Sequence, residues 1–241
     1  MNNTKIWAHR GASGYMPENT MEAFELAIRQ NADGIELDVQ MSKDGELMIL
    51  HDETVDRVTD QKGFLKDFTK EQLKSMRVAP DRDGAGICRI PTLFEVLDLM
   101  RGTDMTVNIE LKNSIFLYQN LEERVFALVK ELGMEERVIY STFNHYSVRK
   151  MREMEPEARI GLLLCDGIVD APAYARRLGA DAIHPSVYHL WYPGFVEQVR
   201  QEGLELHVWT ANTSQEFALL KGAGTDAVIT NYPDQARAFW A

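Results

Sequence analysis

Cysteine is scarce in this sequence, with only two among 241 residues, and these two lie far apart at Cys88 and Cys165. Neither has the spacing of a metal-ligand pair, so we expect reduced thiols rather than a disulfide framework or a zinc site. Long hydrophobic runs are also missing, which argues against a membrane span. The first residues contain no apolar segment typical of a signal peptide. We therefore expect a soluble, cytoplasmic protein with no stable membrane association.

Clusters of basic residues are missing as well. The chain has 26 Lys and Arg against 37 Asp and Glu, which gives a formal net charge of −11. Nucleic-acid binding needs clustered Lys and Arg, so this balance argues against a nucleic-acid partner. The 45% of apolar and 26% of charged residues are ordinary for a globular protein. Neither composition nor motif spacing contains a signal for a particular oligomeric state.

Short apolar runs alternate with amphipathic segments along almost the whole chain. The runs predict strands at residues 6–8, 34–39, 105–111, 138–141, 158–164, 182–184, 206–210 and 227–229. The amphipathic segments predict helices at 20–30, 93–100, 121–132, 146–154, 173–178, 195–202, 216–221 and 234–240. This alternation is typical of parallel strands joined by crossover helices. An open doubly wound sheet also fits, but eight units in about 240 residues favour a single (β/α)8 TIM barrel over residues 1–241.

The alternation is interrupted once, after the second predicted strand. The turn signal Asp44-Gly45, followed by the apolar run 47–50, predicts a β-hairpin. Residues from about 52 to 90 then form a polar insertion. Loops that follow barrel strands build the active site, so this insertion is placed to influence substrate choice. Before the first helix, Asn19 and Glu22 predict a capping box.

Acidic residues occur inside two strands that we expect to be buried. Glu36 and Asp38 are two positions apart, so a strand places both carboxylates on one face. Asn108, Glu110 and Lys112 share one face of the next ring strand in the same way. Three carboxylates that meet at one barrel end would repel by roughly 12 kcal/mol in total at an effective dielectric near 20. Such a trio binds a cation or holds protons, unless each acid forms a separate ion pair.

Ligation by carboxylates alone favours a hard ion, so we expect one divalent cation, Mg²⁺ or Ca²⁺. The first strand ends at His9 and Arg10, which brings an imidazole and the paired donors of a guanidinium to the same barrel end. A core histidine followed by a surface charge is the alternative interpretation of this pair.

A second histidine follows the predicted hairpin. A two-residue turn at Asp44-Gly45 would place His51 opposite Asp38, and a turn one residue earlier would place it opposite or diagonal to Glu36. Either register brings the imidazole to the carboxylates. Two imidazoles that titrate near neutrality, beside a cation site, are suited to phosphoryl transfer.

The sequence resembles the glycerophosphodiester phosphodiesterase family in motifs spread over nearly the whole chain. The motifs are His9-Arg10-Gly11, Pro17-Glu18-Asn19-Thr20, Glu36-Leu37-Asp38-Val39, Asp44-Gly45, His51-Asp52, Glu110-Leu111-Lys112, Val208-Trp209-Thr210-Ala211-Asn212, Asp226 and Ile229-Thr230-Asn231-Tyr232-Pro233. No single motif is specific, but the set is. The resemblance implies a barrel enzyme that converts small-molecule glycerophosphodiesters to an alcohol and sn-glycerol 3-phosphate.

The resemblance also implies a role for each site residue. It assigns the divalent cation to Glu36, Asp38 and Glu110, acid–base catalysis to His9 and His51, phosphate contacts to Arg10 and Lys112, and the pocket wall to Phe143 and Trp209. It further implies that the glycerol hydroxyl of the substrate attacks first, giving a cyclic phosphate that water opens. This fits the lack of an obvious Ser or Cys nucleophile motif.

Two alternatives stay open at this point. One is a lipid-directed phosphodiesterase on the same barrel, although Phe64, Phe68 and Leu73 lie among many charges in the insertion and are poor membrane-binding material. The other is a non-catalytic binding barrel, which the joint presence of three acids, two histidines and two cations disfavours. Either histidine can be the acid, and either Mg²⁺ or Ca²⁺ fits.

Overall fold

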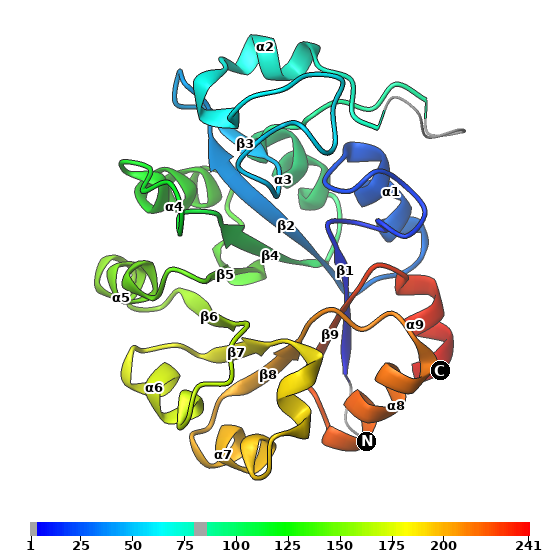
Figure 1. The fold of residues 1–241 in the computed structure, drawn as a ribbon, viewed down its shortest axis with the longest axis vertical. Coiled ribbons are helices and arrows are strands. Elements are labelled where there is room, and N and C mark those ends of the chain that lie inside the picture. Colours follow the sequence, from blue (N-terminus) through cyan, green and yellow to red (C-terminus); the bar gives the residue numbers. More distant parts are fainter. Residues whose placement is uncertain (1–3, 80–85) are drawn as a thin grey trace.

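The computed structural model of the protein describes residues 4–79 and 86–241. Eight parallel strands form a closed ring with helices outside it (Figure 1). The order around the ring is β1, β9, β8, β7, β6, β5, β4 and β2, and β2 pairs with β1 to close it. The predicted TIM barrel is therefore confirmed. The ring strands are β1 (Lys5–His9), β2 (Gly34–Met41), β4 (Thr106–Leu111), β5 (Val138–Thr142), β6 (Arg159–Leu164), β7 (Ala182–Pro185), β8 (Glu205–Val208) and β9 (Ala227–Thr230).

Eight helices cover the outside of the described ring, and their bounds differ from the predicted ones by at most two residues. They are α1 (Met21–Arg29), α3 (Leu93–Arg101), α4 (Leu121–Glu131), α5 (His145–Met154), α6 (Ala171–Arg177), α7 (Phe195–Gln201), α8 (Ser214–Ala223) and α9 (Pro233–Trp240). Capping boxes at Thr92 and Thr213 explain where α3 and α8 begin. Within residues 4–79 and 86–241, no helix combines the length and apolar character needed to cross a bilayer.

The two faces of each ring strand pack into different layers. Ile35, Leu37 and Val39 of β2 point outward and join the apolar core between ring and helices. A smaller apolar cluster fills the barrel interior and consists of Trp7, Ile139, Ala182, Ala227 and Ile229. Since side chains alternate along a strand, Glu36 and Asp38 of β2 point inward. The predicted acids thus face the barrel interior.

Residues 52–79 of the predicted insertion lie at one end of the molecule's long axis (Figure 1). Strand β3 (Leu47–Ile49), which belongs to the predicted hairpin just before the insertion, pairs antiparallel with β2 outside the ring. The short helices η1 (Leu65–Asp67) and α2 (Lys70–Ser75) follow. The segment is less polar than predicted, because it has an apolar core of its own. This core consists of Met48, Leu50, Val55, Leu65, Leu73, Met76, Val78, Cys88 and Ile90.

The hairpin between β2 and β3 has a different register from the two predicted ones. Met41 pairs with Leu47, so the loop spans residues 42–46 rather than the predicted two-residue turn. The Ser42 hydroxyl donates a hydrogen bond of 2.6 Å to Asp44 Oδ1 inside this loop. This side-chain contact stabilises a wider turn than the Asp-Gly pair alone predicts.

Helix α1 begins later than the predicted capping box requires. Thr20, rather than Asn19, is the N-cap, and its hydroxyl accepts a hydrogen bond from the Ala23 amide. Asn19 has a left-handed backbone with a φ of 57°. The predicted pairing of Asn19 with Glu22 is therefore wrong, since two adjacent residues both suit an N-cap and Thr20 takes that position. The side chain of Asn19 is left for another contact.

Candidate active site

The strand register arranges inward side chains of β1, β2 and β4 in two levels. In the lower level, Glu36 pairs with His9 on one side and with Asn108 on the other. In the upper level, Asp38 pairs with Glu110. Paired residues of adjacent strands lie on the same face of a sheet. All five side chains therefore point into the barrel near the carboxyl ends of the strands, where barrel enzymes have their active sites.

The three acids form a compact buried cluster. One oxygen from each of Glu36, Asp38 and Glu110 lies within 4.8 Å of the other two. Their exposed fractions are 4%, 0% and 8%. Burial and the nearby Asp38 carboxylate raise the pKa of Glu36 well above its usual range and also raise the pKa of Glu110. Each of these two acids is therefore harder to ionise than an ordinary glutamate unless a cation compensates its charge.

Asp38 stays ionised because cationic and polar groups surround it. Burial alone would raise its pKa, but Arg10, His51 and Lys112 together lower it. Arg10 Nε lies 3.3 Å from Asp38 Oδ2, and Lys112 Nζ lies 3.9 Å from Oδ1. The side-chain amide of Asn19 donates a 2.8 Å hydrogen bond to Oδ2. Among the residues that the structure describes, Oδ1 accepts no hydrogen bond.

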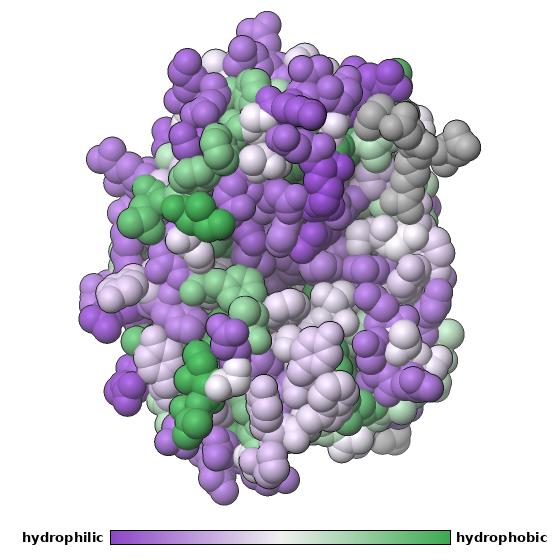
Figure 2. Space-filling model, viewed as in Figure 1, coloured by the Kyte–Doolittle hydropathy of each residue, from purple (hydrophilic) through white to green (hydrophobic). Residues whose placement is uncertain are grey.

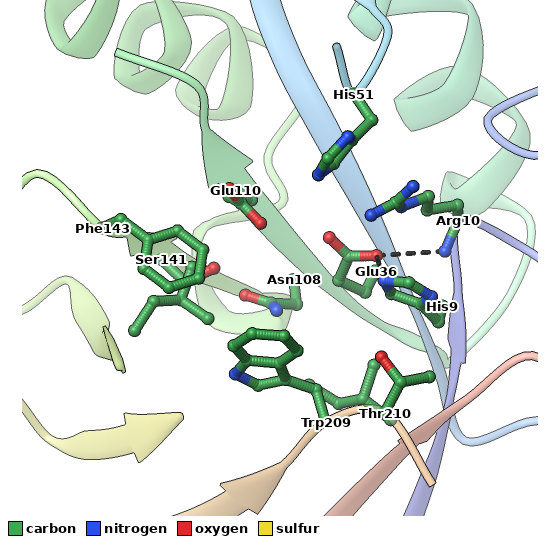
Figure 3. Close-up of a pocket in the computed structure, with 12 residues that line it drawn as sticks. His9, Arg10, Glu36, His51, Asn108, Glu110, Ser141, Phe143, Trp209 and Thr210 are labelled. Atoms are coloured by element: carbon green, nitrogen blue, oxygen red, sulfur yellow. Dashed lines mark hydrogen bonds and ion pairs between the residues drawn. The ribbon is translucent and has the colours of Figure 1, made fainter. Parts of the chain in front are cut away.

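The two cations expected to contact phosphate are both paired with carboxylates. Lys112 Nζ donates to Glu110 Oε1 at 2.9 Å, and Arg10 Nη1 donates to Glu18 Oε1 at 2.9 Å. The backbone amide of Arg10 donates to Glu36 Oε2 at 3.0 Å, the dashed contact in Figure 3. Arg10 lines the pocket, whereas Lys112 is not among the lining residues and contacts Glu110, which is. The guanidinium is thus the more accessible of the two cations.

The turn after β1 positions Arg10. The φ of Arg10 is 57° and that of Gly11 is 79°, both in the left-handed region that glycine adopts most readily. A Cβ atom on Gly11 would lie 2.6 Å from the carbonyl carbon of Ala23 in α1, which is too close for any other residue. The backbone amide of Asn19 also donates to the Arg10 carbonyl. This close approach of α1 directs Arg10 and Asn19 into one site.

His9 is held by hydrogen bonding and stays neutral. Its Nδ1 donates to Asn231 Oδ1 at 2.7 Å, and its Nε2 lies 4.0 Å from Glu36 Oε2. Burial and the Arg10 charge lower the pKa of His9 to about 4. With Nδ1 carrying the ring proton, the lone pair of Nε2 faces the acids and can accept a proton.

His51 lies in the loop after β3, beyond the paired residues of the hairpin. The predicted opposition to Asp38 or Glu36 in the ladder is therefore wrong. The imidazole nevertheless lines the same pocket as Glu36 and Glu110 and points toward it (Figure 3). Its Nδ1 contacts Asp52 Oδ1 at 2.7 Å, which fixes the ring orientation.

Arg57 links the His51 side of the pocket to the Arg10 side. Its Nε donates to Asp52 Oδ2 at 2.6 Å, and its Nη1 donates to Glu18 Oε2 at 2.9 Å. Glu18 in turn accepts the hydrogen bond from Arg10. A continuous chain of charged side chains therefore joins the insertion to the turn after β1.

The charged groups of the site do not balance. Five carboxylates face three cationic side chains, which leaves two negative charges when all acids are ionised and both histidines are neutral. A divalent cation would supply the missing charge. The donor set fits such an ion, because the clustered ligands are all oxygens and one buried Asp38 oxygen accepts no hydrogen bond from the described residues. The five carboxylates in this count are Glu18, Glu36, Asp38, Asp52 and Glu110, and the three cationic side chains are Arg10, Arg57 and Lys112.

The side of the pocket across from the acids is apolar. The rings of Phe143 and Trp209 meet edge to face with centroids 5.7 Å apart, and Leu163 and Ile229 also line the pocket. Its volume of about 200 Å³ suits a small ligand. On the molecular face in Figure 2, hydrophilic side chains gather at the centre below the insertion, with apolar ones to their left near α4.

The structure brings all nine predicted site residues together. Seven line one pocket, and the other two, Asp38 and Lys112, contact the lining residues Arg10 and Glu110. The sequence interpretation missed four polar residues. Alternation along β4 already put Asn108 on the face of Glu110, and Asn19 and Asn231 stand in motifs that carry the family resemblance, whereas Ser141 had no comparable signal. The missed residues are Asn19, Asn108, Ser141 and Asn231.

Comparison with known proteins identifies the family. Residues 9–235 match the glycerophosphoryl diester phosphodiesterase family, and the chain belongs to it. This is a family of phosphoric diester hydrolases. The chain is 44% identical over 233 residues to a glycerophosphodiester phosphodiesterase of Caldanaerobacter subterraneus subsp. tengcongensis, covering 96% of this chain and 95% of that relative.

Solved structures agree with this assignment. The crystal structure of a glycerophosphodiester phosphodiesterase from Agrobacterium tumefaciens has 31% identity and a TM-score of 0.84, covering 98% of this chain and 99% of that one. A phosphodiesterase from Oleispira antarctica, solved in complex with its product sn-glycerol-3-phosphate, has 26% identity and a TM-score of 0.83. That match covers 98% of this chain and 96% of the other.

Proposed function

We propose that the protein hydrolyses glycerophosphodiesters to an alcohol and sn-glycerol 3-phosphate, using one divalent cation and the acid–base pair His9 and His51. The observation that carries this proposal is the buried acid cluster beside a small pocket lined by two histidines, in a site where five carboxylates face only three cationic side chains. The family supports the substrate class. The product bound to the relative from Oleispira antarctica supports the product.

Glu36, Asp38 and Glu110 would hold the cation, and Mg²⁺ and Ca²⁺ both suit this set of oxygens. When bound, the ion supplies positive charge that polarises the phosphoryl group and stabilises charge developing on its oxygens. Arg10 adds paired donors for two phosphate oxygens from the pocket wall. Lys112 is the second proposed phosphate contact, from its position on Glu110.

The two histidines transfer protons at the two oxygens that change bonds to phosphorus. One imidazole takes the proton from the glycerol hydroxyl beside the phosphate while the oxygen of that hydroxyl attacks phosphorus. The other imidazole gives a proton to the leaving alcohol oxygen, which yields the alcohol and a cyclic phosphate. The roles then reverse as a deprotonated water attacks and a ring oxygen is protonated, which yields sn-glycerol 3-phosphate. Phe143 and Trp209 would contact the carbon part of the substrate.

The test is hydrolysis of glycerophosphocholine and glycerophosphoethanolamine, with sn-glycerol 3-phosphate as the measured product. We expect product with added Mg²⁺ or Ca²⁺ and none with a chelator. Product that is insensitive to the chelator would contradict the cation requirement. No product from folded protein with either ion would contradict the substrate class and favour another diester or a binding role.

A matched pair of variants tests the site itself. Glu110→Gln removes one proposed ligand and should abolish the cation-dependent reaction while the fold is retained. Glu205→Gln changes a carboxylate at the opposite end of the barrel, where β8 begins, and should leave the reaction intact. Full activity of Glu110→Gln would contradict the ligand assignment.

A further inference from the structure

Two buried polar side chains in the pocket have no role in the proposed mechanism. Asn108 of β4 is 1% exposed and Ser141 of β5 is 0% exposed, and both line the pocket. Within residues 4–79 and 86–241, neither Asn108 Oδ1 nor Ser141 Oγ has a hydrogen-bond partner. Buried polar atoms nearly always have a hydrogen-bond partner. Two such atoms that lack one and face a pocket therefore indicate a ligand that supplies the missing partners.

Neighbouring polar residues on the same strand ends show what pairing inside the protein looks like. The Asn113 amide donates to Glu122 Oε1 at 3.1 Å and to Ser147 Oγ at 2.7 Å. The Thr142 hydroxyl donates to the Leu111 carbonyl at 3.0 Å. These side chains face away from the pocket and are satisfied by the protein. Asn108 and Ser141 differ from these residues because their side chains point inward, where the described protein offers their oxygen atoms no hydrogen-bond partner.

The strand register places the two residues beside the proposed cation ligands. Asn108 pairs with Glu36, and Ser141 pairs with Glu110. In Figure 3, Asn108 lies between Glu36 and Trp209. Ser141 also lines the pocket, and we call the polar surface formed by Asn108 and Ser141 the pocket floor. A substrate whose phosphate contacts Arg10 would direct one ester arm toward this floor.

The chemistry of the floor selects the kind of arm. An amide oxygen needs a donor, and a serine hydroxyl can both donate and accept. A phosphate dianion and a quaternary ammonium group offer no donor, so neither satisfies Asn108 Oδ1. A hydroxyl-bearing chain supplies donors and acceptors, and its C–H groups can pack on Phe143 and Trp209.

We propose that Asn108 and Ser141 form a hydroxyl-binding subsite that holds the polyol arm of the substrate, an inference that rests on the proposed function. The two residues act as specificity-determining groups: they bind the hydroxyls of a glycerol arm and thereby favour polyol diesters over diesters with plain alkyl arms. Because the subsite lies next to the cation ligands, it also holds the attacking hydroxyl close to the phosphate.

The test compares two phosphate monoesters that have the same carbon chain. The dissociation constants of sn-glycerol 3-phosphate and n-propyl phosphate are measured by calorimetry at saturating Mg²⁺ for wild type, Asn108→Leu and Ser141→Ala. Wild type should bind sn-glycerol 3-phosphate more tightly. Each variant should lose this preference by about tenfold or more, since an unmade hydrogen bond to a substrate hydroxyl discriminates strongly. The affinity for n-propyl phosphate should stay within about twofold of wild type, because it does not use these contacts.

Asn113→Leu is the matched control, since it removes the same amide from a position beyond the end of the same strand. It should lower the melting temperature by breaking contacts inside the protein and leave the ligand preference unchanged. Asn108→Leu should have a melting temperature at or above that of wild type, because no described residue pairs with its amide oxygen. Ser141→Ala, which deletes one atom, provides a second variant of minimal perturbation.

Three outcomes would overturn the subsite. Wild type could bind the two monoesters equally well, or the variants could lose affinity for both monoesters to the same extent. The third outcome is that Asn108→Leu mainly weakens the affinity for Mg²⁺. The last result would make Asn108 a cation ligand instead. Hydrolysis of glycerophosphoethanolamine is measured in parallel. A wild type that prefers sn-glycerol 3-phosphate but releases no product would contradict the proposed function and support the subsite, so the two failures are distinguishable.

Discussion

The side-chain amide of Asn19 donates a hydrogen bond of 2.8 Å to Asp38 Oδ2, although the two residues belong to the turn before α1 and to the middle of β2. With Arg10 Nε 3.3 Å from the same oxygen, this contact fixes the orientation of the Asp38 carboxylate. The other oxygen, Oδ1, is thereby directed away from the turn. A partner that orients a ligand contributes to cation affinity although it does not touch the ion.

Replacing Asn19 by alanine should weaken cation binding. We expect Asn19→Ala to lower the apparent affinity for the activating cation by about 10- to 100-fold, the usual effect of losing a residue that orients a ligand. The measurement is activity as a function of cation concentration. Thr20→Ala is the control, because it removes the α1 N-cap and should cost about 1 kcal/mol of stability without changing cation affinity. An unchanged affinity in Asn19→Ala would show that Arg10 alone orients Asp38.

Replacing Glu36 by glutamine should maintain or raise the stability of the cation-free protein and at the same time weaken cation binding. Glu36 is buried next to Asp38 and Glu110, so its negative charge destabilises the cation-free fold at neutral pH. With a chelator, Glu36→Gln should melt at or above the wild-type temperature. With the cation at a hundred times its dissociation constant, the free energy of unfolding of wild type should rise by about 2.7 kcal/mol, and that of the variant should change little. An equal gain in both proteins, measured by calorimetric melting, would contradict the role of Glu36 as a ligand.

Substitutions at His51 and Asp52 should reduce the rate to different extents. His51→Ala removes a proposed acid–base group and should lower kcat by about 10²- to 10⁴-fold. Asp52→Asn keeps an oxygen that can accept from Nδ1 and loses only the charge, so its loss should be smaller. The readout is the steady-state rate with glycerophosphoethanolamine. A loss of less than tenfold in His51→Ala would rule the imidazole out as an acid–base group.

Arg57 should make the stability of the protein sensitive to acid. Its hydrogen bonds lower the pKa of Asp52. Burial raises the pKa of Glu18, but Arg57 and Arg10 together lower it below its ordinary value. An acid with a depressed pKa stabilises the fold above its ordinary value of about 4, and this stabilisation is lost as pH falls through the folded-state pKa. Arg57→Ala should therefore be less stable than wild type at pH 7, and its stability should fall less than that of wild type as the pH is lowered.

Urea unfolding at several pH values between about 2 and 7 measures this difference, because both proteins can be compared across the titration of the two acids. Arg29→Ala serves as the control, since Arg29 pairs only with the exposed Glu25 on α1 among the described contacts. Parallel stability curves for wild type and Arg57→Ala would contradict the prediction.

The barrel was predictable from the sequence because its signals repeat. Alternation with a period of two marks Glu36, Asp38 and Glu110 as inward-facing acids, and the parallel arrangement brings strand ends to one rim. Because the same pattern recurs in every strand, an error in the predicted boundary of one strand does not change the predicted fold. The placement of the acids follows from this regularity rather than from any single residue.

The details that were predicted wrongly depend on single side-chain contacts. The Ser42 hydroxyl stabilises a wide hairpin loop that the Asp44-Gly45 signal does not reveal. Asn19 and Thr20 both suit the N-cap on propensity, but the Asn19 amide donates its hydrogen bond to the distant Asp38 carboxylate. Contacts between residues far apart in sequence leave no periodic signal. For the same reason, the pairing of His9 with Asn231 was not predicted.

The separate apolar core of the insertion has a consequence for how the protein loses activity. His51 belongs to the segment that this core holds together, whereas the other site residues of the ring depend on the barrel core. Small cooperative units of this kind open at a lower free energy than the whole domain. A transient opening of the insertion would remove one imidazole and leave the ring folded. Mild denaturant should therefore inactivate the protein reversibly before any loss of barrel structure, so activity reports the stability of the insertion rather than that of the barrel.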